Sequence, residues 1–389
     1  MAKARESSMS PQVELVVEPS QVTPSRDSSS RAIKHSSFCP ILSNFHAGYF
    51  RISLSLCGQA LMWKTLGDQQ ENAIILRHFL GLTPSTALVF IWSFALFSVL
   101  FLSLLYLLRC IFHFEKVKAE FIHSVGVNYM FVPWISCLFL IQSCPFIMEP
   151  TSLVYLVLWW IFIIPIVILD LKIYGQWFTK GKRYLSNVAN PTCLISVIAN
   201  FAGAWAAADM GNMESGLFMF ALGVAHYLVL FVTLYQGYEG RSRWIGSSLK
   251  PVFFLFFAAP SMASLTWHSL NSSSSFDSLS KLLFYLSIFL CISLLCRPNM
   301  FKKSMRKYSV AWWAYSFPLT ILAMDSAEYA HQVKGVVPHA LMLFFSSLSF
   351  LVSLLLVLYT TLNIKSRRLK SLFMGKQNQC FCNNDKMPV

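Results

Sequence analysis

Charged residues are scarce in this sequence. They make up 12% of its 389 residues, whereas hydrophobic residues make up 56%, and the mean hydropathy is +0.55. Soluble globular domains carry about 25% charged residues, so the composition excludes that class and indicates several membrane-spanning segments. The formal net charge is +14, but the basic residues stand in short loops between apolar segments. Membrane topology explains them there, and we expect no nucleic-acid partner.

Sequence signatures of intramembrane chemistry are also missing. The chain has no HExxH motif, no serine–histidine pair placed for catalysis and no paired carboxylates in the middle of an apolar segment. Its ten cysteines do not suggest a disulfide framework, because most stand in or against apolar segments and not in exposed loops. We therefore expect no enzyme, no catalytic residue, no metal site and no cofactor.

Ten apolar segments are long enough to span a bilayer, which takes about 20 helical residues. They cover approximately 44–66, 84–108, 127–146, 151–171, 190–209, 214–236, 250–268, 279–297, 307–329 and 338–363. The sequence thus predicts an all-α integral membrane protein with a ten-helix transmembrane domain at 44–363. Residues 1–43 are expected to form a disordered cytoplasmic tail, and residues 364–389 a basic cytoplasmic tail. Ser8 and Ser29 each follow an arginine by three residues, a spacing that suits phosphorylation by a protein kinase.

The loops alternate in charge along the chain. Basic residues gather after the second, fourth, sixth and eighth segments, for example at Arg109, Lys182 and Arg243, whereas the other loops hold acidic residues. By the positive-inside rule, both termini are cytoplasmic. The one N-x-S/T sequon without proline begins at Asn271, in the loop between the seventh and eighth segments. It falls on the predicted exterior and is a candidate glycosylation site.

The apolar segments also alternate in character. The second, eighth and tenth are nearly continuous Leu, Phe, Ile and Val, whereas the odd segments are interrupted by small and polar residues such as Ser53, Asn128 and Asn200. Small residues permit close approach of helices and polar residues need partners. We therefore expect five helical hairpins, with kinked odd helices lining a central axis and even helices outside. Pro165 in the fourth segment and His226 in the sixth depart from this pattern.

Proline is expected to bend most of the odd segments. Pro318 has no N–H and crowds the carbonyl of Ala314, so a helix through it must kink and leave an oxygen unpaired. Such a kink is tolerated where it faces protein or a water-filled cavity. The ninth segment is therefore predicted either to line a pore, with Phe317 at the bend, or to form a packing kink in a bundle. Further kinks along the pore are expected at Pro133, Pro191 and Pro260.

A few ionisable residues have two open interpretations. Arg51 either provides a cationic step for entering anions or reaches to the membrane interface. His226 either titrates near physiological pH or is hydrogen-bonded to a neighbour. Asp325 and Glu328 are expected near the outer end of the ninth segment, solvated or paired with Lys334. The absence of a carboxylate from the middle of these segments favours interpretation of the chain as a passive channel and not as an ion-coupled transporter.

Four stretches resemble one known family, the plant slow-type (S-type) anion channels, within the wider group of tellurite-resistance and dicarboxylate transporters. The stretches are FHAGYFRISLSLCGQALMW at 45–63, GVAHYLVLFVTLYQ at 223–236, PVFFLFFAAPSMA at 251–263 and SVAWWAYSFPLT at 309–320. The similarity covers residues 44–363, and the short tails make the chain similar to the short members of the family.

The resemblance implies a trimer, either homomeric or mixed with longer members, in which each subunit has its own pore. It implies passive efflux of nitrate or chloride across the plasma membrane and a pore plugged by the phenylalanine before the proline of the ninth helix, here Phe317. Kinases open the long-tailed members, so the short tails leave that regulation open. Two alternative functions also remain open: a non-conducting regulatory subunit of a mixed trimer, and a secondary transporter of small organic anions such as malate.

Overall fold

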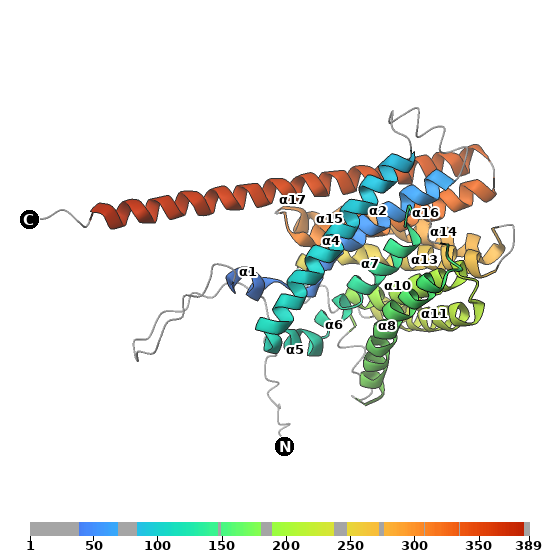
Figure 1. The fold of residues 1–389 in the computed structure, drawn as a ribbon. Coiled ribbons are helices and arrows are strands. Elements are labelled where there is room, and N and C mark those ends of the chain that lie inside the picture. Colours follow the sequence, from blue (N-terminus) through green and yellow to red (C-terminus); the bar gives the residue numbers. More distant parts are fainter. Residues whose placement is uncertain are drawn as a thin grey trace, which may run out of the picture. The chain divides into compact units, whose positions relative to one another are not determined.

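The computed structural model describes residues 39–68, 84–146, 149–179, 189–236, 247–271, 276–306, 308–333 and 335–384. Every regular element among them is a helix (Figure 1), as the composition predicts. Most of the predicted N-terminal tail, residues 1–38, lies outside the described part of the chain. A short helix, α1 (Cys39–Asn44), begins inside the range assigned to that tail.

Five helices pack in a closed sequence of neighbours, which we call the inner ring. Each contacts the next along the chain and the last contacts the first. The members are α2 (Arg51–Asp68), α7 (Val132–Gln142), α10 (Leu194–Asp209), α13 (Leu255–Leu270) and α16 (Trp313–Gln332).

A second helix packs against each member of the inner ring and follows it in the chain. These outer helices are α4 (Pro84–Phe112), α8 (Leu153–Thr179), α11 (Met213–Gln236), α14 (Ser278–Leu295) and α17 (Val336–Asn384). Inner and outer helices differ greatly in burial. In the inner segment Pro191–Asp209, 89% of the most apolar 18-residue window is buried, whereas in the outer segment Ser85–Phe112 the share is 17%. Alanine and glycine let α10 approach its neighbours closely, whereas the exposed Leu and Phe of α4 suit contact with lipid.

Six described helices are long and apolar enough to cross a membrane, which makes the chain a multi-pass membrane protein. They are Ser85–Phe112, Leu153–Gln176, Pro191–Asp209, Met213–Tyr235, Ser278–Leu295 and Val336–Ile364. A seventh is added if α5 (Phe114–Ile122) and residues 126–142, which meet at a bend of 105°, count as one span. The predicted number was ten. The inner helices α2, α13 and α16 fall below this criterion because they are short or rich in polar residues.

Each inner helix is entered through a short helical turn. The turns are η1 (Ala47–Phe50), α6 (Gly126–Tyr129), η2 (Pro191–Cys193), η3 (Ser247–Phe254) and η5 (Val310–Trp312). Two further short helices, α15 (Pro298–Lys302) and η4 (Ser304–Arg306), precede the last of them.

These turns change the interpretation of two prolines. Pro133 is the second residue of α7 and Pro191 is the first residue of η2. At those positions the missing N–H costs no hydrogen bond, so neither proline interrupts a helix interior. Pro260 and Pro318 do lie inside α13 and α16.

Helix α17 also departs from the sequence-based boundary, because it continues without a break from the predicted last span to Asn384 (Figure 1). The residues from 364 onward were predicted to be a separate tail. In the structure, their first 21 residues, 364–384, extend the same helix.

Candidate functional site

A small cavity lies inside the inner ring. Its volume is about 20 Å³, which is room for about one water molecule. All five inner helices, or the turns that precede them, contribute to its wall. The lining residues are Arg51, Leu54, Tyr129, Val132, Ile195, Val252, Leu255, Trp313, Ala314 and Phe317. Arg51 is the one charged residue among them, and none is acidic.

The lining residues stand at the N-terminal ends of their helices. Arg51, Val132, Leu255 and Trp313 are the first residues of α2, α7, α13 and α16, and Ile195 is the second residue of α10. The N-terminus of a helix carries a partial positive charge of about half a unit. Five such ends converge on the cavity, so its potential favours an anion and disfavours a cation.

Arg51 adds a full positive charge at the same place. Its Nε donates a hydrogen bond to the Gly48 carbonyl at 2.8 Å, and its Cζ lies 4.8 Å from the centroid of the Tyr129 ring. No carboxylate of the described residues pairs with it. The residue is half-buried and lies in the wall of the cavity.

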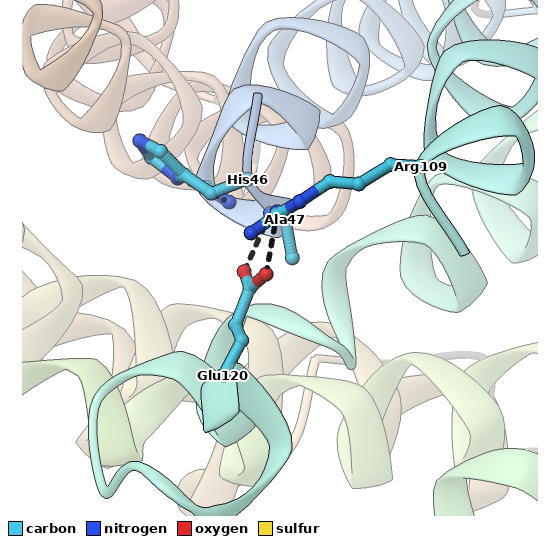
Figure 2. A network of polar contacts seen from close by, with 5 residues as sticks. His46, Ala47, Arg109 and Glu120 are labelled. Atoms are coloured by element: carbon cyan, nitrogen blue, oxygen red, sulfur yellow. Dashed lines mark hydrogen bonds and ion pairs between the residues drawn. The ribbon is translucent and has the colours of Figure 1, made fainter. Parts of the chain in front are cut away.

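A polar network holds the turn that carries Arg51 (Figure 2). The carboxylate of Glu120, on α5, accepts hydrogen bonds from the Ala47 N–H and from Arg109 Nη1, both at 2.7 Å. His46 Nδ1 accepts a hydrogen bond from the Gly48 N–H at 3.1 Å. Helix α5 thereby ties η1 to the end of α4. This region was predicted to be a loop, although Phe114, Val117 and Phe121 recur at helical spacing there.

Phe317 lines the cavity on the side of α16. Its side chain is 2% exposed and stacks on Phe139 of α7, with ring centroids 6.0 Å apart and planes inclined by 25°. Gly58 of α2 lies opposite, where an added Cβ would be 3.6 Å from Phe317 Cδ2 and 3.5 Å from Thr320 Cγ2. The ring therefore fills the space between three inner helices.

The other predicted site residues lie elsewhere. His226 is buried on α11, where its Nδ1 is 3.2 Å from the Ser196 hydroxyl, and it does not line the cavity. Asn271 follows α13, and its Nδ2 donates to Asp277 Oδ2 at 3.1 Å; Ser272 and Ser273 of its sequon lie outside the described residues. Pro133, Pro191, Pro260 and Pro318 are also not among the residues that line the cavity.

Asp325 corrects one expectation from the sequence. It was expected near the outer end of its segment, solvated or paired, but it is 0% exposed and about two turns before the end of α16. Its carboxylate lies beside the hydroxyl groups of Ser264 and Ser261 on α13. Glu328 is also not free, since His268 Nε2 lies 3.2 Å from its Oε1; Lys334 is outside the described residues.

Asp170 is a second buried carboxylate, which sequence analysis did not single out. It lies on α8, and its Oδ2 accepts a hydrogen bond from Asn200 Nδ2 at 2.8 Å. Asn200 was noted in the sequence as a polar interruption of an inner segment. Asn200 faces outward from an inner helix and needs a polar partner there. It was the signal in the sequence that could have located Asp170.

Comparison with known proteins identifies the chain's relatives as anion channels. A family model described as a voltage-dependent anion channel matches residues 44–362. The S-type anion channel SLAH1 of Arabidopsis thaliana is 52% identical over 322 residues, which cover 83% of this chain and 82% of the relative. The S-type anion channel SLAH4 of the same plant is 51% identical over 325 residues, covering 84% and 85%. Its guard cell S-type anion channel SLAC1 is 42% identical over 311 residues, which cover 80% of this chain but 54% of the relative.

Proposed function

The chain belongs to the voltage-dependent anion channel family, and we propose that it is a channel subunit that conducts nitrate and chloride passively across the plasma membrane. Members of this family are channels and not enzymes, as expected from the missing catalytic motifs. The observation that carries the proposal is the convergence of five helix N-termini and Arg51 on a cavity that no carboxylate lines. This arrangement stabilises a partly dehydrated anion.

Phe317 is proposed to be the gate. Its ring is apolar and buried, so it blocks the passage by filling it and by excluding water. Opening then requires another rotamer of Phe317 or a movement of α16. The stacking on Phe139 and the contact distance to Gly58 support this role, because both neighbours belong to other inner helices.

The proposed architecture has ten membrane-spanning helices arranged as five hairpins, with both termini in the cytoplasm. The neighbours of each inner helix and the exposed apolar faces of the outer helices support it. The subunit is proposed to assemble as a trimer, with copies of itself or with longer members of the family. Phosphorylation of the tails by protein kinases is a further part of the proposal.

A secondary transporter of small organic anions is a second candidate, and Asp325 is the observation that favours it. An ion-coupled transporter keeps a carboxyl group inside the membrane to bind the coupling ion, and Asp325 is a fully buried carboxyl group beside the hydroxyls of Ser264 and Ser261. It does not line the cavity, however. The passive channel therefore accounts for more of the structure.

The test is voltage clamp of cells that express this chain alone, as wild type and as Phe317→Ala. We expect Phe317→Ala to pass a current whose reversal potential follows the gradient of chloride or nitrate. Phe284→Ala is the matched control, since it also removes a fully buried ring but one on α14, away from the cavity. It should pass no such leak.

Three outcomes would count against the proposal. Equal currents from Phe317→Ala and Phe284→Ala would contradict the gate. Saturable, proton-dependent uptake that His226→Ala alters would identify a transporter. A protein that reaches the surface but stays silent in every variant, and that changes the current of a longer relative, would identify a regulatory subunit.

A further inference from the structure

We propose that helix α5 is a docking site for anionic phospholipids at the membrane surface. In this site Phe114 and Phe121 insert among the lipids, and Lys118 and Lys172 lie beside the headgroups. The site is separate from the cavity of the inner ring, and it does not depend on the proposed conduction of anions.

Helix α5 lies at the end of a membrane-spanning helix. It follows α4 after a single residue, His113. It meets residues 126–142 at a bend of 105°, so it does not run along the helix that follows it (Figure 1). Arg109 is in the last turn of α4, and Lys116 and Lys118 are in α5 itself. From these basic residues we expect α5 to lie at the cytoplasmic surface of the membrane.

One face of α5 exposes large apolar side chains. Phe114 is 63% exposed and Phe121 is 39% exposed, and their spacing of seven residues places them on the same side of the helix. Exposed Phe112, at the end of α4, continues this apolar surface toward the side of α4 that suits lipid. Contiguous apolar surface of this kind is unfavourable in water. The lipid that covers α4 therefore also reaches α5.

Two lysines accompany these rings. Lys118 is exposed and stands between Phe114 and Phe121 on the same side of the helix. It has no carboxylate partner in the part of the chain that the structure describes. Lys172 of α8 reaches the same place, since its Nζ lies over the ring of Phe121. Basic residues beside an apolar helix face attract anionic lipids, so the charge of this face fits their phosphate groups.

Another edge of α5 is fastened to the protein. Glu120 accepts hydrogen bonds from the Ala47 N–H and from Arg109 Nη1, both at 2.7 Å (Figure 2). These bonds fix the rotation of α5 about its axis, so that Phe114 and Phe121 stay exposed. A preorganised surface loses little entropy on binding.

A second copy of the chain is the alternative cover for this face. Lysine is depleted in protein–protein interfaces, but Lys118 stands in the centre of the face, between the two rings. Lysine is common on helices that lie in the surface of an anionic membrane. The face therefore fits lipid better than a neighbouring subunit.

The first experiment is thermal unfolding of the purified protein in a neutral detergent, with added phosphatidylglycerol or phosphatidylcholine of the same acyl chains. A ligand that binds the folded protein raises its melting temperature. We expect phosphatidylglycerol to raise the melting temperature of the wild type further than phosphatidylcholine does. Lys118→Gln/Lys172→Gln should abolish this difference. Glycerol phosphate, a soluble headgroup, should have no effect because it lacks the acyl chains that contact the two rings.

Two matched controls accompany these variants. Lys302→Gln/Lys303→Gln removes two exposed lysines from another basic loop and should retain the difference between the lipids. Phe114→Ser should reduce the difference, whereas Phe97→Ser, which removes an equally exposed ring from the middle of α4, should retain it. Equal losses from the two double lysine variants, or stabilisation by glycerol phosphate alone, would overturn the inference.

Native mass spectrometry provides a second measurement, because it counts the lipids that stay bound to each chain. We expect the wild type to retain more phosphatidylglycerol than Phe114→Ser, with the same number of chains in both assemblies. A smaller assembly of Phe114→Ser that retains its lipid would assign the face to a neighbouring subunit and overturn the inference. If the double variant of Lys118 and Lys172 does not fold, Lys118→Gln alone decides in both assays, since Lys118 is exposed.

Discussion

Two glycines near the cavity differ in what surrounds them. A Cβ at Gly126 would lie 2.4 Å from the backbone oxygen of Glu120, whereas a Cβ at Gly58 would be in ordinary contact, at 3.5 Å from Thr320 Cγ2. The backbone of α5 cannot yield without disturbing Glu120 and its bonds to η1. We expect Gly126→Ala to lower the free energy of unfolding by about 1–3 kcal/mol. Gly58→Ala should change it by less than about 0.5 kcal/mol.

Thermal unfolding of the two purified variants beside the wild type measures this difference. The pair controls for the added methyl group itself. If Gly126→Ala were as stable as Gly58→Ala, the close approach of α6 to α5 would be wrong, and with it the network that fixes the turn at Ala47.

Single residues of the site were predictable to different degrees. Phe317 was identified because a proline follows it, and Arg51 because a cation in an apolar segment is unusual. Tyr129 and Glu120 were not identified, since each acts through a residue far away in the chain. Asp325 was misplaced because a carboxylate near the end of an apolar segment usually reaches water. The surroundings of Tyr129, Glu120 and Asp325 are formed by residues that are distant in the sequence.

Helices α16 and α17 are joined by a ladder of hydroxyl pairs. Ser316 and Ser353 lie 2.6 Å apart, Thr320 and Ser349 lie 2.9 Å apart, and Gln59 Nε2 donates to Ser349 at 2.8 Å. Hydrogen bonds between helices in a membrane are worth about 0.6–2 kcal/mol each. Ser349→Ala removes two of them, and we expect a loss of about 1–3 kcal/mol in the free energy of unfolding.

Ser347→Ala is the control on the same helix, because that side chain is exposed. It should unfold at the wild-type temperature. Because the ladder holds the helix that carries Phe317, we also expect the current of Ser349→Ala in the voltage clamp to differ from that of the wild type. Equal stability of the two alanine variants would show that the ladder does not join the helices.

The N-terminus of α14 is capped by Asp277. Its Oδ1 accepts a bond from the Ser280 N–H and its Oδ2 accepts one from Trp267 Nε1, both at 2.9 Å. Partial desolvation opposes ionisation, but bonds from Ser280 and Trp267 outweigh it and hold the pKa of Asp277 below its ordinary value of 3.8. Asp277→Ala should therefore lower the free energy of unfolding by about 0.5–2 kcal/mol at neutral pH.

The sign of the pH dependence follows from the lowered pKa. The carboxylate stabilises the fold fully above its unfolded pKa, and this contribution is lost as the pH falls through the folded pKa. We expect the wild type to approach the stability of Asp277→Ala between about pH 5 and about pH 2. If the difference in the free energy of unfolding between the wild type and Asp277→Ala stayed constant across that pH range, the cap would be contradicted.

At the scale of elements, the sequence predicted which helices are buried. Small and polar residues interrupt the segments that became the inner ring, and continuous Leu and Phe mark α4, α14 and α17. It did not predict the short turns before the inner helices, because turns of three to eight residues have too little periodicity to detect. Two of the prolines were assigned to kinks for the same reason. Helix α5 was also not predicted, although its apolar residues recur at helical spacing.

The inner helices all point their N-terminal ends to one cavity. The orientation of the chain in the membrane therefore decides which side of the membrane the positive potential of these helix ends faces. The residues next to those ends, such as Arg109 and Lys302, belong to the basic loops. From the positive-inside rule we therefore expect the cavity to lie toward the cytoplasm. In that orientation it would collect anions that leave the cell.

Asn271 and Cys296 test this orientation, because they stand at opposite ends of the hairpin formed by α13 and α14. Asn271 follows the C-terminal end of α13, and exposed Cys296 follows the C-terminal end of α14. We expect an endoglycosidase to increase the mobility of the wild type and not of Asn271→Gln. An impermeant thiol reagent should label Cys296 only after the cells are permeabilised, with Cys296→Ser as the control. Labelling of Cys296 in intact cells would reverse the topology, and the positive ends of the inner helices would then face the exterior and favour entry of anions.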